Sequence, residues 1–379
     1  MAKQQTDQQA KELSTNQVVE KVEDRKYEKN GKFMRKGQLM ELPEPEDVTH
    51  EDLDLTEEDV LEMYENMLLQ RRFERMAKKM YTRQKIAGFL HLYIGQEAVS
   101  TGSVWAVNDD DPVITAYRDH GLGLARGMDP GACMAELYGK IDGCSRGKGG
   151  SMHFFSKEHA FFGGHGIVGG CVPLGTGIAF AQKYKDTGRV CLTYLGDGAS
   201  NIGAFYEAAN LAGLYDLPQV LIIENNDYGM GTSVVRSAAE PQLYRRAPAF
   251  RMKGRVINGM DVFSVYKAVK EHAEMARNNE PSLLEIRTYR YEGHSMSDPA
   301  DYRGEDELED MQKKDPTIIL KKYILEEGLA DNDDLDAIDE KVKDAVDEAI
   351  DFAENSSFPD EQTIYEDIYA QEDYPFLTD

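Results

Sequence analysis

Two short apolar runs with a helical stretch between them constrain the fold of this chain more than any other feature. Val190–Leu195 and Gln219–Glu224 are rich in β-branched and other apolar residues, and Asn201–Leu214 between them is typical of a helix. Ser282–Arg287 indicates a third buried strand. Because buried strands that alternate with helices form parallel sheets covered by helices on both faces, the sequence predicts an α/β fold.

The chain divides into a polar extension and one larger domain. Residues 1–55 are polar, and we expect them to form a flexible extension. Residues 56–379 are expected to form the domain, which begins with a helix at Glu57–Tyr81 and ends in a helical region from about residue 305. A helix of small residues is predicted at Val172–Tyr184. Apolar residues recur at helical spacing near the end of the chain, at Ile338, Val342, Val346, Ile350 and Ala353.

The composition excludes several classes of function. There are 69 Asp and Glu residues against 43 Lys and Arg, and a net charge of −26 repels nucleic acid and anionic membranes. No apolar run is long enough to cross a bilayer. The acidic N-terminal stretch resembles neither a secretion signal nor a transit peptide, so a cytoplasmic location is expected. We hypothesise that the acidity suits a high-salt cytoplasm, which an activity optimum in dilute buffer would contradict.

The four cysteines, Cys133, Cys144, Cys171 and Cys191, lack the paired spacing of a metal site. Free thiols in a reducing compartment are therefore expected.

Polar residues follow both central strands. Asp197 lies between Gly196 and Gly198 after the first strand, and Asn226 and Tyr228 follow the second. Ligands bind at the carboxyl ends of such strands. A carboxylate from Asp197, an amide oxygen from Asn226 and the backbone carbonyl of Tyr228 are ligands that Mg²⁺ prefers. The two glycines would let phosphates approach, and the free N–H groups of the following helix would face the anion.

The GDG sequence also allows a competing interpretation as a phosphatase. Haloacid-dehalogenase-type phosphatases also carry a GDG sequence after a strand, and residues 52–56 (DLDLT) imitate their nucleophile motif. That nucleophile must end a buried strand, but residues 46–51 are polar, and Asn201 stands where an acid is needed. The phosphatase interpretation is therefore rejected.

Two glycine-rich stretches, residues 147–150 and 163–170, mark backbone that turns sharply or lies close to a ligand. They are accompanied by cations and histidines, at Arg146, Lys148, His153 and His165. Surface turns are the alternative.

The GDG sequence at 196–198 is followed, after the 26 residues 199–224, by Asn225 and Asn226, which resembles the thiamine diphosphate fingerprint. From about Glu57 to Tyr369 the chain resembles the α subunits of thiamine-diphosphate-dependent 2-oxo acid dehydrogenases, in particular the pyruvate form. The matching stretches are GFLHLYIGQEA (88–98), TAYRDHG (115–121), RGKGGSMH (146–153), GGHGIVGG (163–170), VPLGTGIA (172–179), ENNDYGMGTSV (224–234) and YRYEGHSMSDP (289–299).

The resemblance implies a thiamine-diphosphate-binding fold and a role for individual residues. Mg²⁺ would be held by Asp197, Asn226 and the Tyr228 carbonyl. His91 would contact the 2-oxo acid, and His91 and His294 are the residue type suited to proton transfer. Residues implied to contact thiamine diphosphate are Tyr117, Arg118, Ser156, Gly166, Val168, Asp197, Gly198, Ala199, Asn226, Arg290 and His294.

The resemblance also implies oxidative decarboxylation of pyruvate, with transfer of the acetyl group to a lipoyl domain. It implies an α₂β₂ heterotetramer with a β subunit, docked on a lipoyl-bearing acyltransferase core. Acetoin dehydrogenase and branched-chain 2-oxo acid dehydrogenase α subunits remain alternatives, as does a non-catalytic cofactor-binding scaffold. Ser295 and Ser233 match phosphorylated positions of mitochondrial relatives, whereas Asp301 replaces a third; their modification here stays open.

Overall fold

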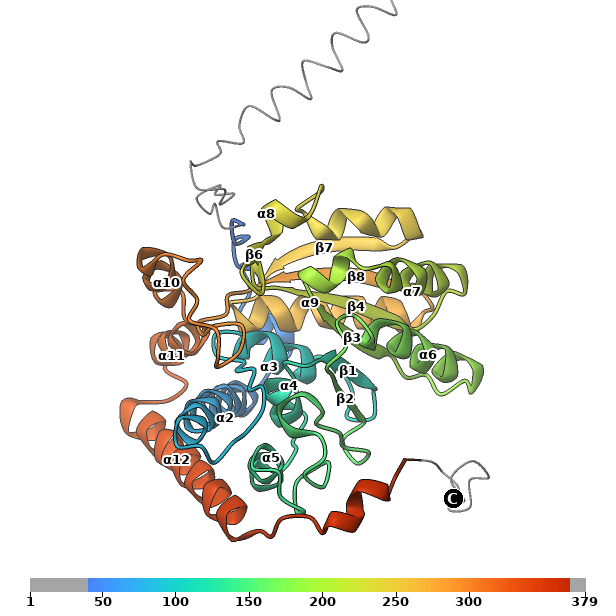
Figure 1. The fold of residues 1–379 in the computed structure, drawn as a ribbon. Helices are drawn as coiled ribbons and strands as arrows, with labels where there is room; N and C mark the ends of the chain where they lie inside the picture. Colours follow the sequence, from blue (N-terminus) through green and yellow to red (C-terminus); the bar gives the residue numbers. More distant parts are fainter. Residues whose placement is uncertain (1–39, 369–379) are drawn as a thin grey trace, which may run out of the picture. The chain divides into compact units, whose positions relative to one another are not determined.

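A six-stranded parallel sheet lies at the centre of the fold in the computed structural model, which describes residues 40–368 (Figure 1). The strand order is β2-β1-β3-β4-β8-β7, and every neighbouring pair is parallel. The α/β prediction is confirmed. The strands are β1 (Val113–Ala116), β2 (Phe161–His165), β3 (Cys191–Gly196), β4 (Gln219–Asn225), β7 (Lys253–Asn258) and β8 (Ser282–Arg287).

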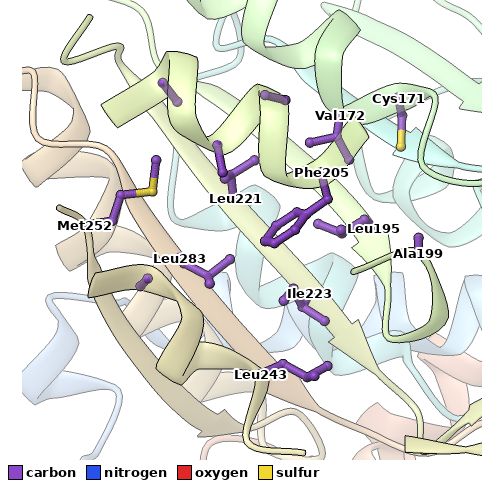
Figure 2. Packing of buried hydrophobic residues seen from close by; sticks show 14 of the residues in the cluster. Cys171, Val172, Leu195, Ala199, Phe205, Leu221, Ile223, Leu243, Met252 and Leu283 are labelled. Carbon is purple, nitrogen blue, oxygen red and sulfur yellow. The ribbon is translucent and has the colours of Figure 1, made fainter. Parts of the chain in front are cut away.

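One face of the sheet is covered by α6 (Cys171–Tyr184) and α7 (Gly203–Leu214). Figure 2 shows Phe205 of α7 lying over the strand that carries Leu221 and Ile223. Ile222, which lies between Leu221 and Ile223 on β4, points to the opposite face, because side chains alternate along a strand. Since helices cover both faces, β4 is buried throughout, which explains its nearly uninterrupted apolar sequence.

The other face is covered by α3 (Glu97–Trp105) and α9 (Val262–Arg277), and α2 (Glu57–Thr82) packs beside them. A second apolar cluster joins these helices to α11 (Pro316–Glu327). Local signals set the helix starts. Thr56 and Asp59 form a capping box at α2, and Asp315 caps α11, which has proline in its first turn.

The long last helix, α12 (Asn332–Asn355), packs along α5 (Pro130–Leu137) and α2. Its buried side includes Val342, Val346, Ile350 and Ala353, as the apolar spacing predicts. The remaining short α-helices and strands are α4 (His120–Ala125), α8 (Val234–Ser237), α10 (Glu305–Gln312), β5 (Tyr228–Gly229) and β6 (Thr232–Ser233). Short 3₁₀ helices also occur at η2 (Gly150–Met152), η4 (Leu243–Phe250) and η5 (Glu361–Tyr365).

The predicted extension is only partly described, because residues 1–39 lie outside the described range. Its last part packs against the domain: Leu53 and Leu55 are buried in the cluster of α2, α9 and α11. The Glu46 N–H donates to Ser264 Oγ at 2.8 Å, and the Glu46 carboxylate pairs with Arg255. Packed structure therefore begins before residue 56, because two leucines among the acids bury apolar surface.

Residues 52–56 do not end a strand. Glu51–Leu53 is a single 3₁₀ turn, and Thr56 caps α2. This geometry agrees with the rejection of the phosphatase motif.

All four cysteines are free within the part of the chain that the structure describes, as predicted. Among the helices of residues 40–368, none is long and apolar enough to span a bilayer.

Candidate active site

The carboxyl ends of β3 and β4 lie side by side. Gly196 pairs with Glu224 at the last rung of the ladder, so Asp197 and Asn226 leave the sheet at the same edge. The loop after β4 then packs against the loop after β3. A Cβ built on Gly229 would lie 3.3 Å from the Gly198 Cα atom and 3.7 Å from Oδ2 of Asp197. The predicted juxtaposition of the two strand ends is confirmed, and glycines at 198 and 229 allow it.

A cavity of about 270 Å³ opens at this edge of the sheet. Its wall combines residues from the ends of β1, β3 and β4 with residues from three loops. Nine of the residues implied by the sequence line it: Tyr117, Arg118, Val168, Asp197, Gly198, Ala199, Asn226, Tyr228 and His294.

His91 and Arg290 lie just behind the cavity wall. The His91 ring centroid is 4.7 Å from that of Tyr117 and 5.3 Å from that of His294. Arg290 is buried and donates to the carbonyl of the cavity residue Met230 at 3.3 Å and to Tyr302 Oη at 3.0 Å. Both residues can therefore influence a ligand in the cavity.

The structure does not bring Ser156 to the cavity. Ser156 bridges to Phe161, the first residue of β2, and so lies at the end of that strand opposite to the site. Its hydroxyl is 2.7 Å from Nδ1 of His159. Gly166 also stands outside the cavity lining. A Cβ there would lie 3.2 Å from Nε2 of His153, so the position has little room for a side chain.

Asp197 is 4% exposed, and its Oδ2 atom has no hydrogen-bond partner among the described residues. Burial raises its pKa to about 7, although Arg290 and Arg118 oppose the shift. A buried carboxylate is costly unless a cation compensates it. The side chain is therefore suited to bind a divalent cation such as Mg²⁺.

The neighbouring donors are neutral oxygens. Oδ1 of Asn226 makes one long contact, 3.4 Å from the Tyr228 N–H, which leaves it available to an ion. Within residues 40–368, no three His, Cys, Asp or Glu side chains converge as a metal cluster. An ion here would thus be held by one carboxylate with amide and carbonyl oxygens, and Mg²⁺ accepts such a set when phosphates complete it.

Positive groups gather above this carboxylate. The Arg118 guanidinium donates to the carbonyls of Leu92, at 2.5 Å, and His294, at 2.9 Å. Burial and the nearby Arg290 lower the pKa of Arg118 to about 10. Burial and Arg118 lower the pKa of His91 to about 3 and that of His294 to about 4. The site concentrates positive potential, so it fits a multiply charged anion such as a diphosphate.

The segment after Asp197 differs from the prediction. A helix was expected to start at Asn201, but Gly198–Asn201 forms a 3₁₀ turn, Ile202 is extended, and α7 starts at Gly203. Ser200 Oγ donates to the Asp197 carbonyl at 2.6 Å and closes the tighter turn. The first N–H groups after Asp197 therefore belong to a short turn and not to an α-helix.

Gln96 and Glu224 are among the cavity residues that sequence reasoning missed. Gln96 Oε1 accepts from Asn226 Nδ2 at 3.0 Å, and this contact orients the amide oxygen of Asn226. Glu224 accepts from the Tyr93 hydroxyl at 2.5 Å, and burial raises its pKa to about 7. Both lie in stretches that match the family, at 88–98 and 224–234, which was the available signal.

Comparison with known proteins agrees with this geometry. The sequence profile described as "Dehydrogenase E1 component" matches residues 65–362. A Rickettsia bellii (strain RML369-C) protein named "Pyruvate dehydrogenase E1 component subunit alpha" is 49% identical over 314 residues, covering 83% of this chain and 96% of the relative. The Rhizobium meliloti (strain 1021) protein of the same name is 49% identical over 317 residues, covering 83% and 91%.

A rice (Oryza sativa subsp. japonica) protein named "Pyruvate dehydrogenase E1 component subunit alpha-3, chloroplastic" is also similar. It is 44% identical over 326 residues, which cover 83% of this chain and 77% of the relative. The family resemblance predicted from the motifs is confirmed: this chain belongs to the dehydrogenase E1 component family.

Proposed function

We propose that this chain is the α subunit of the decarboxylating component of a pyruvate dehydrogenase complex. In this role it takes part in the oxidative decarboxylation of pyruvate and the transfer of the acetyl group to a lipoyl domain. The observation that supports this function best is the uncompensated Asp197 carboxylate beside Asn226, below the buried cation Arg118. A metal-bound diphosphate satisfies both charges at once. The names of the relatives favour pyruvate as the substrate.

Thiamine diphosphate and Mg²⁺ are the proposed cofactors. Asp197, Asn226 and the Tyr228 carbonyl would hold the ion, and Arg118 and Arg290 would balance the diphosphate charge. Bound thiamine diphosphate would supply the electron sink that decarboxylation of a 2-oxo acid needs. The protein contributes binding, orientation and a buried environment.

His91 is the proposed contact for the 2-oxo acid. It is buried beside the Tyr117 and His294 rings, and its Nδ1 atom lacks a hydrogen-bond partner within residues 40–368. Its lowered pKa, about 3, keeps the imidazole neutral near pH 7. A neutral imidazole has one donor and one acceptor nitrogen, so it can donate a hydrogen bond to a substrate oxygen or accept one from a hydroxyl.

A β subunit is the proposed partner, in an α₂β₂ heterotetramer that docks on a lipoyl-bearing acyltransferase core. Large apolar side chains near the site are exposed: Phe89 by 64%, Ile167 by 80% and Met230 by 65%. Met230 also lines the cavity. Exposed apolar residues that gather around a binding site favour burial by another subunit. The cytoplasmic location expected from the sequence remains a prediction.

Reconstitution tests this function. The chain is co-expressed with a candidate β subunit, and turnover of pyruvate, acetoin and 3-methyl-2-oxobutanoate is measured with a dye acceptor. Turnover should require thiamine diphosphate and Mg²⁺ and should be fastest with pyruvate. Asp197→Ala should abolish it, whereas Asp216→Ala, at an exposed position paired with Arg251, should not. Faster turnover of another substrate would favour a sister enzyme, and an assembled complex without turnover would favour the scaffold alternative.

A further inference from the structure

The segment 91–93 places two side chains at the site although it is neither helix nor strand. His91 lies against the Tyr117 and His294 rings, and the Tyr93 hydroxyl donates to Glu224. A buried segment outside regular secondary structure must satisfy its backbone polar groups in another way. The groups that do so determine where His91 lies.

Three backbone groups of this segment are held by buried side chains. The His91 N–H donates to Ser151 Oγ at 3.1 Å, and the Tyr93 N–H donates to Glu74 Oε1 at 2.8 Å. Between them, the Leu92 carbonyl accepts from Arg118 at 2.5 Å. Alternate N–H groups of an extended segment point to the same side, so Ser151 and Glu74 hold one side of it.

His120 connects these two acceptors. Its Nδ1 atom is 3.0 Å from Glu74 Oε1, and its Nε2 atom is 3.0 Å from both the carbonyl and the hydroxyl oxygen of Ser151. His120 and Glu74 are completely buried, and Ser151 is nearly so. Burial opposes the charged form of His120, but Glu74 raises its pKa overall. Both ring nitrogens face acceptors, which an imidazolium satisfies with two donated hydrogen bonds.

Ser151 is itself held in place from the other side. It directly follows the glycine-rich loop 145–150, whose N–H groups converge on the buried carboxylate of Glu136. The four donors are Ser145 at 2.8 Å, Gly147 at 2.8 Å, Gly149 at 2.7 Å and Gly150 at 2.9 Å. Because every one of these is a backbone group, the loop has little freedom to move Ser151.

We propose that Ser151, His120 and Glu74 are positioning residues that hold the backbone of segment 91–93 so that the His91 imidazole faces the substrate. They act through His91 and touch neither cofactor nor substrate. This inference rests on the proposed role of His91. It also gives the RGKGGSMH stretch a function: the glycines let a loop wrap Glu136 and deliver Ser151 to His91.

A double-mutant cycle between Ser151 and His91 tests the proposal in the reconstituted α–β complex with pyruvate. Ser151→Ala should lower kcat/KM by about 10- to 100-fold, because a small displacement of a reacting group has an effect of this size. In a His91→Ala background, Ser151→Ala should have no further effect, since the imidazole it positions is gone. Ser151→Thr, which keeps the hydroxyl, should retain most of the activity. If the losses of kcat/KM caused by Ser151→Ala and by His91→Ala multiply in the double variant, the proposal is overturned.

Two measurements keep the outcome decisive. A crystal structure of the Ser151→Ala complex should show the His91 ring displaced from Tyr117 and His294, and an unmoved ring would overturn the proposal. Glu74→Gln serves as a second variant if Ser151→Ala does not assemble, with the same expected dependence on His91. The matched control is Ser282→Ala, a buried serine at the start of β8, which should leave kcat/KM unchanged.

The same experiment separates this inference from the proposed function. If the wild-type complex does not turn over pyruvate, the proposed function fails. The position of the His91 ring in the variant crystal structure then still decides whether Ser151 positions it.

Discussion

Asp197 and Glu136 are both buried carboxylates, but their surroundings are opposite. Glu136, at the glycine-rich loop, is 0% exposed and accepts four backbone N–H groups. Asp197, at the end of β3, has an oxygen without a hydrogen-bond partner in the described part of the chain. A satisfied buried carboxylate stabilises the fold that surrounds it, whereas an unsatisfied one indicates a site for a ligand. The two regions therefore respond differently to the same chemical change.

The largest effect is expected at Asp197. Asp197→Asn should lower the turnover of the α–β complex by more than about 100-fold, because a direct metal ligand matters more than the outer-shell groups whose loss has effects of this order. The thermal stability of the metal-free chain should stay the same or rise, since a buried charge without a partner is removed.

Turnover assays and thermal unfolding of the same preparation check both outcomes. Asp216→Asn, at an exposed site, is the matched control. A metal-free variant that is clearly less stable than the wild type would contradict the interpretation of Asp197 as a ligand-binding carboxylate.

The opposite change in stability, a loss, is expected when Glu136 is substituted. Glu136→Gln turns two acceptor positions into one acceptor and one donor, so at least one N–H of the loop loses its partner. The free energy of unfolding should fall by roughly 3 kcal/mol, as for a buried network that is left partly unsatisfied. Urea denaturation of the purified chain measures this loss.

Asp339→Asn is the control for Glu136, because Asp339 pairs with Arg72 at a partly exposed site and should contribute less than about 1 kcal/mol. If both substitutions had equally small effects, the four N–H contacts of Glu136 would not stabilise the fold.

His272 provides a test of whether a buried group without a hydrogen-bond partner always indicates a ligand-binding site. It is buried on α9 outside the cavity lining, and its Nδ1 atom has no hydrogen-bond partner among residues 40–368. Burial and Arg255 lower its pKa to about 4. The unfolded chain therefore takes up the proton first as the pH falls, and stability is lost from about pH 6.5 toward pH 4.

His272→Asn should reduce the loss of unfolding free energy between pH 7 and pH 4.5 by on the order of 2 kcal/mol. Turnover at pH 7 should not change. Urea denaturation at both pH values, with turnover assays beside it, measures the effect. A variant with lower turnover but an unchanged pH dependence of stability would show that His272 acts on the site although it lies outside the cavity lining.

Much of the fold could be predicted because its signals are local. The apolar run of β4 depends on a few consecutive residues, and so does the capping box that Thr56 and Asp59 form at the start of α2. The start of α7 could not be predicted, since a bond from Ser200 to the Asp197 carbonyl tightens the turn and delays the helix. The sequence gives no sign of which competing local hydrogen bond forms.

The candidate site was predictable to a similar degree. Asp197 and Asn226 each follow a strand directly, so the parallel sheet brings them together. Ser156 was placed at the site by resemblance alone, and the structure puts it at the other end of β2. Gln96 was missed because its role depends on Asn226, 130 residues away in the chain.

The α/β architecture, the adjacent strand ends and the kind of ligand that an acid and an amide there can hold are all readable from the amino-acid sequence. These follow from residue order, because strand direction and side-chain alternation are set within each element. Which buried groups have hydrogen-bond partners becomes visible only in the folded chain. Glu136 at the glycine-rich loop, and His120 between Glu74 and Ser151, look like ordinary helix and loop residues until packing brings distant segments together. Hydrogen-bond satisfaction is a property of the folded interior, and no local pattern encodes it.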